Sequence, residues 1–349
     1  FSVLQNRINL TADTYRRLSD GQIMKATVPL ETGEGSITTN IGAVRNTGIE
    51  LGLNLGVIRN KNFTWDVNLA FARNWSKITE LPNGDDVSNN WFIGERLNVL
   101  RDYTSAGIIT TDGITMRTKD GDRHYTLQEV YDTFGPSGQG LKWYEGQMAV
   151  NDWNNDGKIN DEDKQIFGCT DPKWTGSLSS TMTYKGFDFS FMLYTKQGQW
   201  SRSYFHEQYM NYGDRGRQKV NFDYYIPAGT PVLDKNTGDV TYLSEAHIGK
   251  YPYPNNTEKT GGGYFSSSSA AVRYHKTSFV KVKNITLGYT FPKAWLSKIA
   301  VKHLRLYVNV INPFCFTDYE GFDPEWASAN LTNGGPASVT YQIGANIKF

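Results

Sequence analysis

One stretch of twelve residues has the residue types and the spacing of a metal site. Residues 152–163 read Asp-Trp-Asn-Asn-Asp-Gly-Lys-Ile-Asn-Asp-Glu-Asp, which follows the calcium-loop pattern D-x-[DN]-x-[DN]-G with an acid at position 12. Carboxylate, amide and carbonyl oxygens are the ligands of Ca²⁺, and the glycine permits the sharp turn that brings them to one centre. The pattern therefore predicts a bound Ca²⁺.

The position of each residue in this loop gives its expected role. Gly157 provides the turn, and Ile159 anchors the loop to apolar surroundings. The last ligand is Asp rather than Glu and the flanks lack helices, so we expect a structural clip of modest affinity rather than a calcium switch. An Asx-rich solvated turn is the alternative interpretation. The expected ligands are Asp152, Asn154, Asp156, the backbone carbonyl of Lys158, Asn160 and Asp163.

The other reactive side chains follow no catalytic or redox pattern. The five histidines occur in no H-E-x-x-H or triad-like context, and the sequence has no G-x-S-x-G and no phosphate-binding glycine loop. Two cysteines, Cys169 and Cys315, are too few for a disulfide framework; one bridge is possible, but we expect two unpaired thiols. The 36 basic and 35 acidic residues nearly cancel, which argues against nucleic-acid binding. We therefore predict no enzyme.

The elements that must position the predicted calcium loop are strands. In the last residues of the sequence, alternate side chains are apolar and the intervening ones are polar, so the two sets lie on opposite faces of a strand. This strand ends on an aromatic residue, as expected of the assembly signal of an outer-membrane barrel. The apolar set is Val339, Tyr341, Ile343, Ala345, Ile347 and Phe349.

The same alternation recurs along the chain and predicts eight strands. Each is long enough for the ~9–11 residues with which a barrel strand crosses a bilayer. No stretch approaches the ~18 consecutive apolar residues of a transmembrane helix, whereas a barrel strand needs an apolar residue only at every second position. The other segments are 48–57, 63–72, 187–194, 284–291 and 303–310, with weaker matches at 3–17 and 173–184.

Short and long connections between these strands alternate. The short ones are 59–61, 185–186 and 292–300, and the long ones are 18–43, 80–172, 201–272 and 313–337. Loops of that length argue against a compact soluble β-protein, which is the alternative, and are typical of outer-membrane barrels with short periplasmic turns and long extracellular loops. The sequence predicts an all-β fold, an antiparallel transmembrane β-barrel, whose N-terminal strands precede residue 1.

The predicted loops are rich in aromatic residues. Several of them could stack on sugar rings or could pack the loops together, and these are Trp200, Tyr204, Phe205, Tyr209, Tyr212 and Trp326. A large exposed aromatic surface marks a binding site. We expect such a surface from Trp91, Trp143, Tyr225, Tyr251 and Trp326.

The order and spacing of several motifs resemble the SusC-like TonB-dependent transporters over nearly the whole chain. The hairpin Asn46-Thr47-Gly48-Ile49-Glu50-Leu51 with Phe63-Thr64-Trp65 is similar to the family's N-x-G-[IV]-E-L and F-x-W motifs. Gly94-Glu95-Arg96-Leu97 resembles its G-E-P-L stretch, with Arg96 in place of proline. The calcium-type loop followed by Gly168, Asp171-Pro172 and 184–188, the stretch 278–292 and the terminal Phe349 complete the resemblance.

This resemblance implies a 22-stranded barrel plugged by an N-terminal domain, of which residues 1–349 would be the C-terminal part and 80–172 a long extracellular loop. It further implies outer-membrane location and TonB-dependent import of a bulky nutrient, an oligosaccharide or a peptide. The implied partners are a SusD-like surface lipoprotein, the TonB complex and outer-membrane lipid. A passive porin and a secreted calcium-binding adhesion or dockerin-like module are the alternatives.

Overall fold

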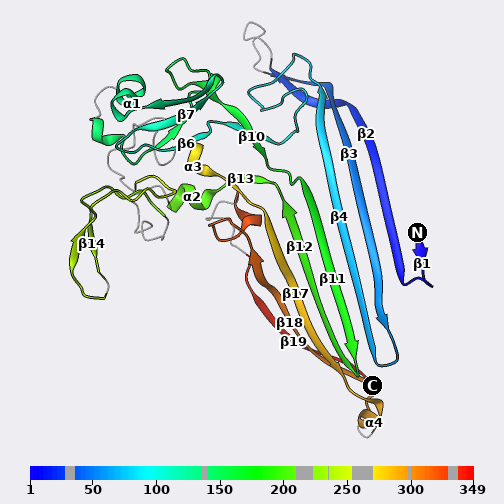
Figure 1. Ribbon diagram of the computed structural model, residues 1–349. Coiled ribbons are helices and arrows are strands. Elements are labelled where there is room, and N and C mark those ends of the chain that lie inside the picture. Colours follow the sequence, from blue (N-terminus) through cyan, green and yellow to red (C-terminus); the bar gives the residue numbers. More distant parts are fainter. Residues whose placement is uncertain are drawn as a thin grey trace.

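The main element of the molecule is one antiparallel β-sheet. The structure is a computed structural model that describes residues 1–27, 36–135, 140–209, 223–234, 236–253, 270–297, 300–328 and 337–349. Within these residues nine strands form the sheet, in the order β1-β2-β3-β4-β11-β12-β17-β18-β19 (Figure 1). They are β1 (Ser2–Val3), β2 (Ile8–Thr27), β3 (Ser36–Arg59), β4 (Phe63–Glu80), β11 (Trp174–Tyr184), β12 (Phe187–Gln197), β17 (Phe279–Thr290), β18 (His303–Phe316) and β19 (Thr340–Lys348).

Shorter elements occupy the connections between the long strands. Between β4 and β11 are β5 (Val99–Asp102), β6 (Ser105–Ile108), β7 (Ile114–Thr118), β8 (Gly121–Tyr125), α1 (Leu127–Phe134), η2 (Leu141–Trp143), β9 (Met148–Val150), η3 (Asp161–Asp163) and β10 (Gln165–Cys169). Between β12 and β17 are β13 (Trp200–Arg202), α2 (Tyr204–Tyr209), β14 (Pro231–Leu233), β15 (Val240–Tyr242), α3 (Ala270–Arg273) and β16 (Tyr274–Lys276). The others are α4 (Lys293–Leu296) and η7 (Pro324–Trp326).

All eight predicted strands are present as β2, β3, β4, β11, β12, β17, β18 and β19, and each pairs antiparallel with the next along the chain. The weak matches at 3–17 and 173–184 correspond to β2 and β11. None of the described helices is long and apolar enough to cross a membrane.

One face of the sheet is apolar from strand to strand. A row of six side chains in register crosses β4, β11, β12, β17, β18 and β19. Leu287, Val308 and Ile343 in this row are 51%, 45% and 86% exposed. A continuous apolar surface of this kind is costly to leave in water and suits contact with lipid. The row consists of Trp65, Met182, Phe189, Leu287, Val308 and Ile343.

The opposite face carries a polar row one residue further along the same strands. Thr286 Oγ1 donates to Asn309 Oδ1 at 2.9 Å, and Asn309 Nδ2 donates to Gln342 Oε1 at 3.1 Å. Near the end of the sheet, the Arg305 guanidinium forms an ion pair with Asp188 on the next strand but one. Hydrogen-bonded polar rows of this kind suit a face that meets water. The row consists of Asp66, Thr181, Ser190, Thr286, Asn309 and Gln342.

Two glycines in the sheet make room for tyrosine rings on the strand beside them. A Cβ atom on Gly48 would overlap the ring of its cross-strand partner Tyr15, and one on Gly344 would overlap the ring of its partner Tyr307. A ring lying over a glycine covers backbone that would otherwise be bare. Gly48 therefore has a structural reason to be glycine within the Asn46–Leu51 motif.

Aromatic rings also gather where the short connections lie. Phe187 packs against Tyr289 with ring centroids 4.5 Å apart, and Tyr289 packs edge-on to Phe291 at 5.0 Å. Phe63 and Tyr184 form a second pair, at 6.5 Å. A belt of aromatic residues at one end of the strands is typical of the membrane–water interface of a barrel.

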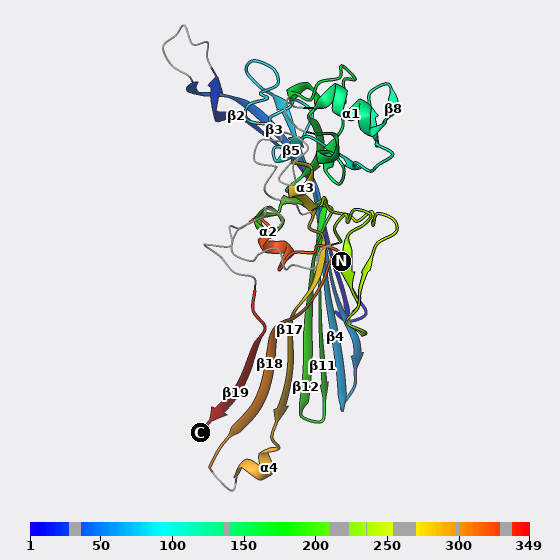
Figure 2. The ribbon, with the colours of Figure 1, turned by 90° about the vertical axis from the view of Figure 1, so that its left-hand side faces the viewer.

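The connections separate onto the two ends of the sheet, as the alternation of lengths predicts. The turns β3–β4, β11–β12 and β17–β18 lie at the end where β19 finishes, and the long connections lie at the other end (Figures 1 and 2). We call these the turn end and the loop end. At the turn end, Lys185 and Gly186 have φ of 46° and 92°, the left-handed conformations that a two-residue hairpin requires.

The prediction of a long loop at 18–43 is wrong. β2 and β3 remain paired as far as Thr27↔Ser36, so only residues 28–35 separate the two strands, and these lie outside the described residues. The register shifts between Ser19 and Gln22, next to Gly21 with φ of 58°. A bulge with a left-handed glycine twists the strands without ending their pairing.

The connection between β4 and β11 folds into a lobe with a core of its own. Its centre is formed by Ile109, Met116, Val130 and Tyr144, each fully buried, and by Tyr125, which is 1% exposed. The helix α1 starts with a capping box, in which Thr126 accepts from the backbone of Glu129 and Glu129 from that of Thr126. The segment 80–172 is thus an ordered unit in the described residues rather than an irregular loop. The described part of 201–272 also contains strands and helices.

Candidate functional site

The predicted calcium loop lies in the lobe and joins β9 to β10. Gly157 has φ of 78° and Asn155 has φ of 60°, so the chain turns sharply in the middle of the loop. Ile159 packs against two of the buried apolar clusters, one with Tyr125 and one with Tyr103 and Val150. The loop therefore has the turn and the apolar anchor that its sequence predicts.

Two of the expected ligands, Asp152 and Asp163, are fully buried. The Asp152 carboxylate accepts from the backbone N–H groups of Asp156 and Gly157, at 3.2 and 3.0 Å. The Asp163 carboxylate accepts from those of Asn154 and Asn160, at 3.3 and 2.8 Å. These bonds draw the first and last residues of the loop together around its centre.

The remaining expected ligands are closer to the surface. Asp156 is exposed, and its Oδ1 accepts from the backbone N–H of Lys158 at 2.8 Å. Asn154 Nδ2 donates to Asp156 and also to Glu162, at 3.1 and 3.0 Å. Glu162 is a contact that the sequence pattern does not predict. Asn160 caps η3 and accepts from the backbone of Glu162.

Acidic side chains alone do not complete a metal site here. No group of three or more His, Cys, Asp or Glu side chains is close enough to hold a metal ion in the described part of the chain. The expected set therefore depends equally on its neutral oxygens, those of Asn154, Asn160 and the Lys158 carbonyl, as calcium loops of this pattern do.

The buried carboxylates leave a negative charge that no side chain neutralises. Burial raises the pKa of Asp163, backbone N–H groups oppose this, and the charge of Asp152 raises the pKa further. Among the described residues, no lysine, arginine or histidine forms an ion pair with either group. Two buried carboxylates near each other are stable only with protons or a cation to compensate them. The residues present thus fit a bound cation.

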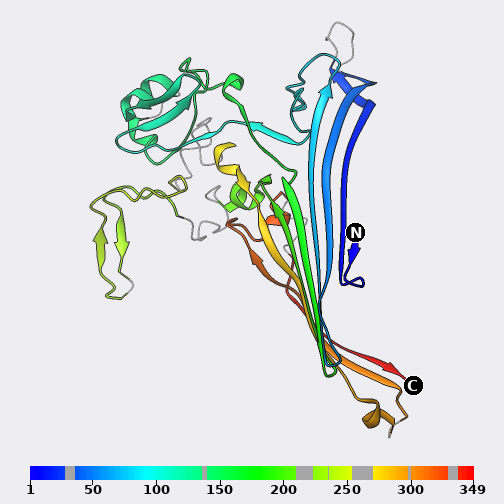
Figure 3. The same cartoon turned by 45° about the vertical axis from the view of Figure 1, so that its right-hand side comes forward.

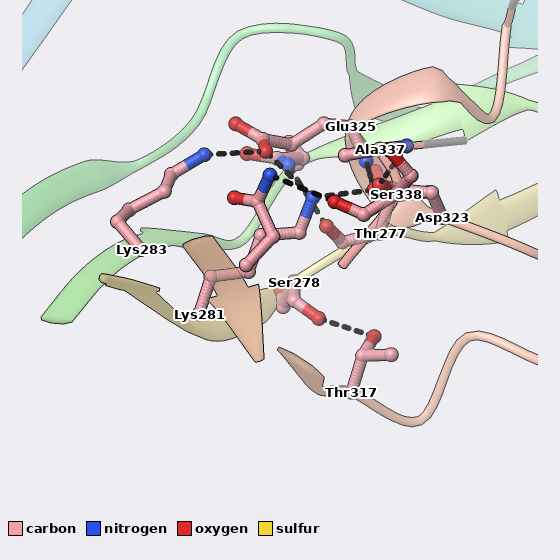
Figure 4. A network of polar contacts seen from close by, with 11 residues as sticks. Thr277, Ser278, Lys281, Lys283, Thr317, Asp323, Glu325, Ala337 and Ser338 are labelled. Carbon is pink, nitrogen blue, oxygen red and sulfur yellow. Dashed lines mark hydrogen bonds and ion pairs between the residues drawn. The ribbon is translucent and has the colours of Figure 1, made fainter. Parts of the chain in front are cut away.

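A second polar cluster fixes the connection between β18 and β19 to the sheet (Figure 4). The ammonium group of Lys281, which is 3% exposed, bonds to Asp323 and Glu325, each at 2.6 Å. Lys283 also bonds to Glu325, at 2.8 Å. Asp323 caps η7 through the backbone of Glu325 and accepts from the backbone of Ala337. We call these four charged residues the Lys281 cluster.

The Lys281 cluster holds this connection on the polar face of the sheet. Lys281 is the cross-strand neighbour of Tyr194. Tyr194 lines a hollow of about 320 Å³ on that face together with Thr11, Asp13 and Glu50. Residues 317–328 therefore fold inward over the loop end of the polar face rather than away from it.

A third cluster joins loops that are far apart in sequence. His206 is fully buried, and its ring stacks on that of His275 with centroids 3.6 Å apart and planes at 17°. Ser203 Oγ lies 2.6 Å from His206 Nδ1 and 2.5 Å from the Tyr319 hydroxyl. Tyr251 contacts His206 Nε2 at 3.3 Å and also bonds to Glu320. We call this the His206 cluster.

The surroundings of the His206 cluster keep both imidazoles neutral. Burial lowers the pKa of His206 to about 2, and the adjacent His275 adds to the shift. Burial also lowers the pKa of His275, although its bond to the Val272 carbonyl opposes this. Because a charged ring would have to lie against another ring in the interior, this cluster is stable only when neutral.

Most of the loop aromatics singled out from the sequence pack the loops together. Trp200 packs against Phe167 at 5.5 Å, and Phe205 is 7% exposed beside Phe322. The expected exposure of Trp143, Tyr225 and Tyr251 is wrong: they are 7%, 0% and 2% exposed, because the loops have apolar cores of their own. Trp326 is exposed as expected, Trp91 and Tyr204 are half-buried, and Tyr212 and the Tyr209 side chain lie outside the described residues.

Both cysteines are free thiols, as expected. Cys169 is buried and Cys315 is exposed on β18. Burial raises the pKa of the Cys169 thiol, so it is a weak nucleophile.

Comparison with known proteins agrees with this architecture. No family model matches the chain. The TonB-dependent receptor P39 of Formosa agariphila is 27% identical over 377 residues, which cover 100% of this chain and 34% of the relative. The TonB-dependent receptor SusC of Bacteroides thetaiotaomicron is 28% identical over 352 residues, which cover 100% of this chain and 31% of the relative.

A solved structure of the RagAB peptide transporter has the same fold, with a TM-score of 0.66 and 20% identity over 100% of this chain and 34% of that chain. The chain thus spans about a third of the length of its relatives. Its open sheet is accordingly part of a larger outer-membrane β-barrel. The alternation of its strands, its two-faced sheet and these similarities together show that the chain is similar over its whole length to TonB-dependent receptors, SusC among them.

Proposed function

We propose that the whole protein imports a bulky nutrient, an oligosaccharide or a peptide, across the outer membrane with energy supplied through TonB. The observation that carries this proposal is the two-faced sheet in a chain that is similar throughout to TonB-dependent receptors. The apolar row that ends at Ile343 would meet lipid, and the polar row that ends at Gln342 would line a wet interior. Transport, not catalysis, is the activity that such a wall serves.

The polar face supports an interior that another part of the protein fills. Its hollow of about 320 Å³ is lined by small residues, among them Gly52, Ala70, Ala72, Gly176 and Ser177. Large barrels of 22 strands hold a plug in the lumen. An N-terminal plug domain, through which TonB acts, would lie against this wall.

The loop end supports a partner that covers the mouth. The connections gather on one side of the sheet there (Figure 3), and their exposed side chains include Phe322, Trp326, Leu233 and Tyr242 at 58%, 48%, 61% and 70%. Exposed apolar side chains on neighbouring loops are typical of a binding surface. We propose a SusD-like surface lipoprotein as the partner, with an interface of the large, stable class above ~2,000 Å².

Purification of the intact protein from outer membranes in mild detergent tests the pair. We expect one lipoprotein to be recovered in stoichiometric amount. Recovery of the transporter alone would contradict the lidded pair. The alternatives predict different behaviour, because a passive porin would swell liposomes without TonB, and a secreted calcium-binding module would be absent from the membrane.

We further propose that the loop 152–163 binds one Ca²⁺ through Asp152, Asn154, Asp156, the Lys158 carbonyl, Asn160 and Asp163. The buried pair of carboxylates that no basic residue neutralises supports this assignment. Calcium supplies the compensating charge, and the chain's own backbone bonds hold Asp152 and Asp163 ready for it. The role is to order the lobe.

Hydrogen exchange of the intact protein with and without calcium tests this site. For a Kd in the range of extracellular modules, about 10⁻⁴–10⁻³ M, a tenfold excess of Ca²⁺ stabilises the loop by about 1.4 kcal/mol. We expect Ca²⁺ to slow exchange in residues 148–169, and Asp152→Asn to abolish the effect. Asp161→Asn is the matched control, because Asp161 lies in the same loop but outside the ligand set, and in the described part of the chain its carboxylate forms an ion pair only with Lys164. Exchange that calcium leaves unchanged in the unaltered protein would refute the assignment.

A further inference from the structure

A pocket of about 480 Å³ lies in the lobe beside the calcium loop. Its walls come from separate elements: Ser105 on β6, Arg117 on β7, Asp122 on β8, Trp153 in the loop after β9, and Phe167 on β10. This volume is within the range of pockets that hold small molecules. Trp153 belongs to the candidate calcium loop, but none of the expected calcium ligands lines the pocket, and the transport proposal does not use it.

The floor of the pocket is fixed by one buried amide. Asn151 is 5% exposed; its Nδ2 donates to Thr104 Oγ1 at 2.9 Å, and its Oδ1 accepts from the backbone N–H of Arg117 at 2.8 Å. Its side chain thus joins the strand β7 to the segment before β6. A pocket with such a floor is already shaped before any ligand enters, which lowers the entropy cost of binding.

The aromatic wall is held in place as well. Phe167 is packed edge-on by Trp200 and by Tyr274, at 5.5 and 5.3 Å. The Trp153 carbonyl accepts from the backbone N–H of Lys119 at 2.8 Å, which ties this residue to the turn between β7 and β8. Trp153 is half-buried, so part of its side chain remains open to the pocket it lines.

The polar wall offers groups that the protein itself does not use. Arg117 and Asp122 are cross-strand neighbours and both are exposed. Within the described residues, neither the guanidinium nor the carboxylate makes a side-chain hydrogen bond or an ion pair. Donors and acceptors therefore face the pocket together, and with one charge of each sign the lining is neutral overall.

From this combination we propose that the pocket binds one sugar ring of a neutral oligosaccharide. A pyranose ring presents a face of C–H groups that packs on an aromatic side chain, and hydroxyl groups that both donate and accept hydrogen bonds. A lining without net charge disfavours ligands that carry a net charge, and a direct binding comparison distinguishes neutral sugars from peptides. The inference rests on the proposed import function and selects oligosaccharide as its substrate class.

Binding to a panel of neutral oligosaccharides and a panel of mixed peptides, measured with the intact purified transporter, tests this inference. We expect an oligosaccharide to bind, and Trp153→Ala to weaken it by about tenfold or more, equal to at least ~1.4 kcal/mol. The double variant Arg117→Ala/Asp122→Ala should have a similar effect and alters only exposed side chains, so its fold is preserved. Lys119→Ala is the control on the same hairpin, because within the described residues Lys119 forms a hydrogen bond only through its backbone N–H, to the Trp153 carbonyl.

Two outcomes would overturn the inference. In the first, both pocket variants bind oligosaccharides with the same affinity as the unaltered transporter. In the second, the unaltered transporter binds only peptides or binds neither panel. Uptake by living cells, measured in parallel, shows whether only the sugar-binding pocket is refuted or whether TonB-dependent import is refuted as well. TonB-dependent uptake that persists in both variants would reject the subsite and leave the transporter assignment standing. Loss of TonB dependence in the unaltered protein would reject the assignment itself.

Discussion

Replacing Lys281 with methionine is expected to release residues 317–328 from the polar face of the sheet. Lys281 is the buried cation between Asp323 and Glu325, whose side chains are 6% and 20% exposed. Removing one partner of a buried ion pair leaves the other charge uncompensated and costs about 3–5 kcal/mol. Hydrogen exchange of the intact transporter should show loss of protection in 317–328 while the strands β11 and β12 keep theirs.

Two further variants separate the buried charge from simple loss of contact. Lys283→Met removes a half-exposed partner of Glu325 and should cost only about 0–1 kcal/mol. The triple variant Lys281→Met/Asp323→Asn/Glu325→Gln removes all the buried charge and should restore much of the protection, because Asn can still cap η7. Protection in Lys281→Met equal to that of Lys283→Met would contradict this account.

Acidification is expected to open the His206 cluster. The pKa of His206 is lowered by burial to about 2, and that of His275 is also lowered. When the pKa of a histidine is lowered in the folded state, its contribution to stability does not change with pH above its unfolded pKa of ~6.5. Below that pH the unfolded form binds a proton that the folded form does not, so proton binding favours unfolding. For His206, local stability should therefore fall by about 1.4 kcal/mol per pH unit as the pH decreases from ~6.5 toward 2, and His275 should add to this fall.

Hydrogen exchange, corrected for the intrinsic effect of pH, measures this opening. Between pH 7.5 and 5.0 the protection of 201–206 and 274–276 should fall about thirtyfold through His206, and further through His275. The hairpin β7–β8 carries only the exposed His124 and is the internal control. His206→Phe keeps a ring in the stack but cannot take up a proton, so the fall in protection with decreasing pH should be smaller in this variant. Equal protection at both pH values would contradict the expected cost of protonation.

The sequence predicts the strands well because the membrane imposes a pattern on them. Between Phe63 and Phe71 every second side chain must be apolar where the sheet faces lipid, so the period of two is visible without homologues. The same pattern does not predict the part of β2 and β3 that lies beyond the bulge between Ser19 and Gln22. Beyond Ser19 the sequence no longer alternates between apolar and polar residues, whereas the backbone pairing continues.

The candidate calcium loop could be singled out from the sequence because its expected ligands lie within twelve consecutive residues. The Lys281 and His206 clusters could not, since they join residues 42 and 44 positions apart in one case and up to 116 in the other. The sequence signal for such clusters is weak: a lysine in an otherwise apolar stretch, Phe279–Val282, and acids flanking Pro324. The prediction that Tyr225 and Tyr251 are exposed is wrong for the same reason. Both residues belong to an apolar core that forms only when distant loops meet.

The most direct test of the central claim is uptake by living cells that carry the intact protein, with and without TonB. The probe is a labelled digest of the polysaccharides and proteins on which the organism grows. If the protein imports its substrate through a plugged barrel that contains this sheet, labelled material should accumulate only when both the protein and TonB are present. Accumulation that depends on the protein but persists without TonB would identify a passive pore and contradict the account.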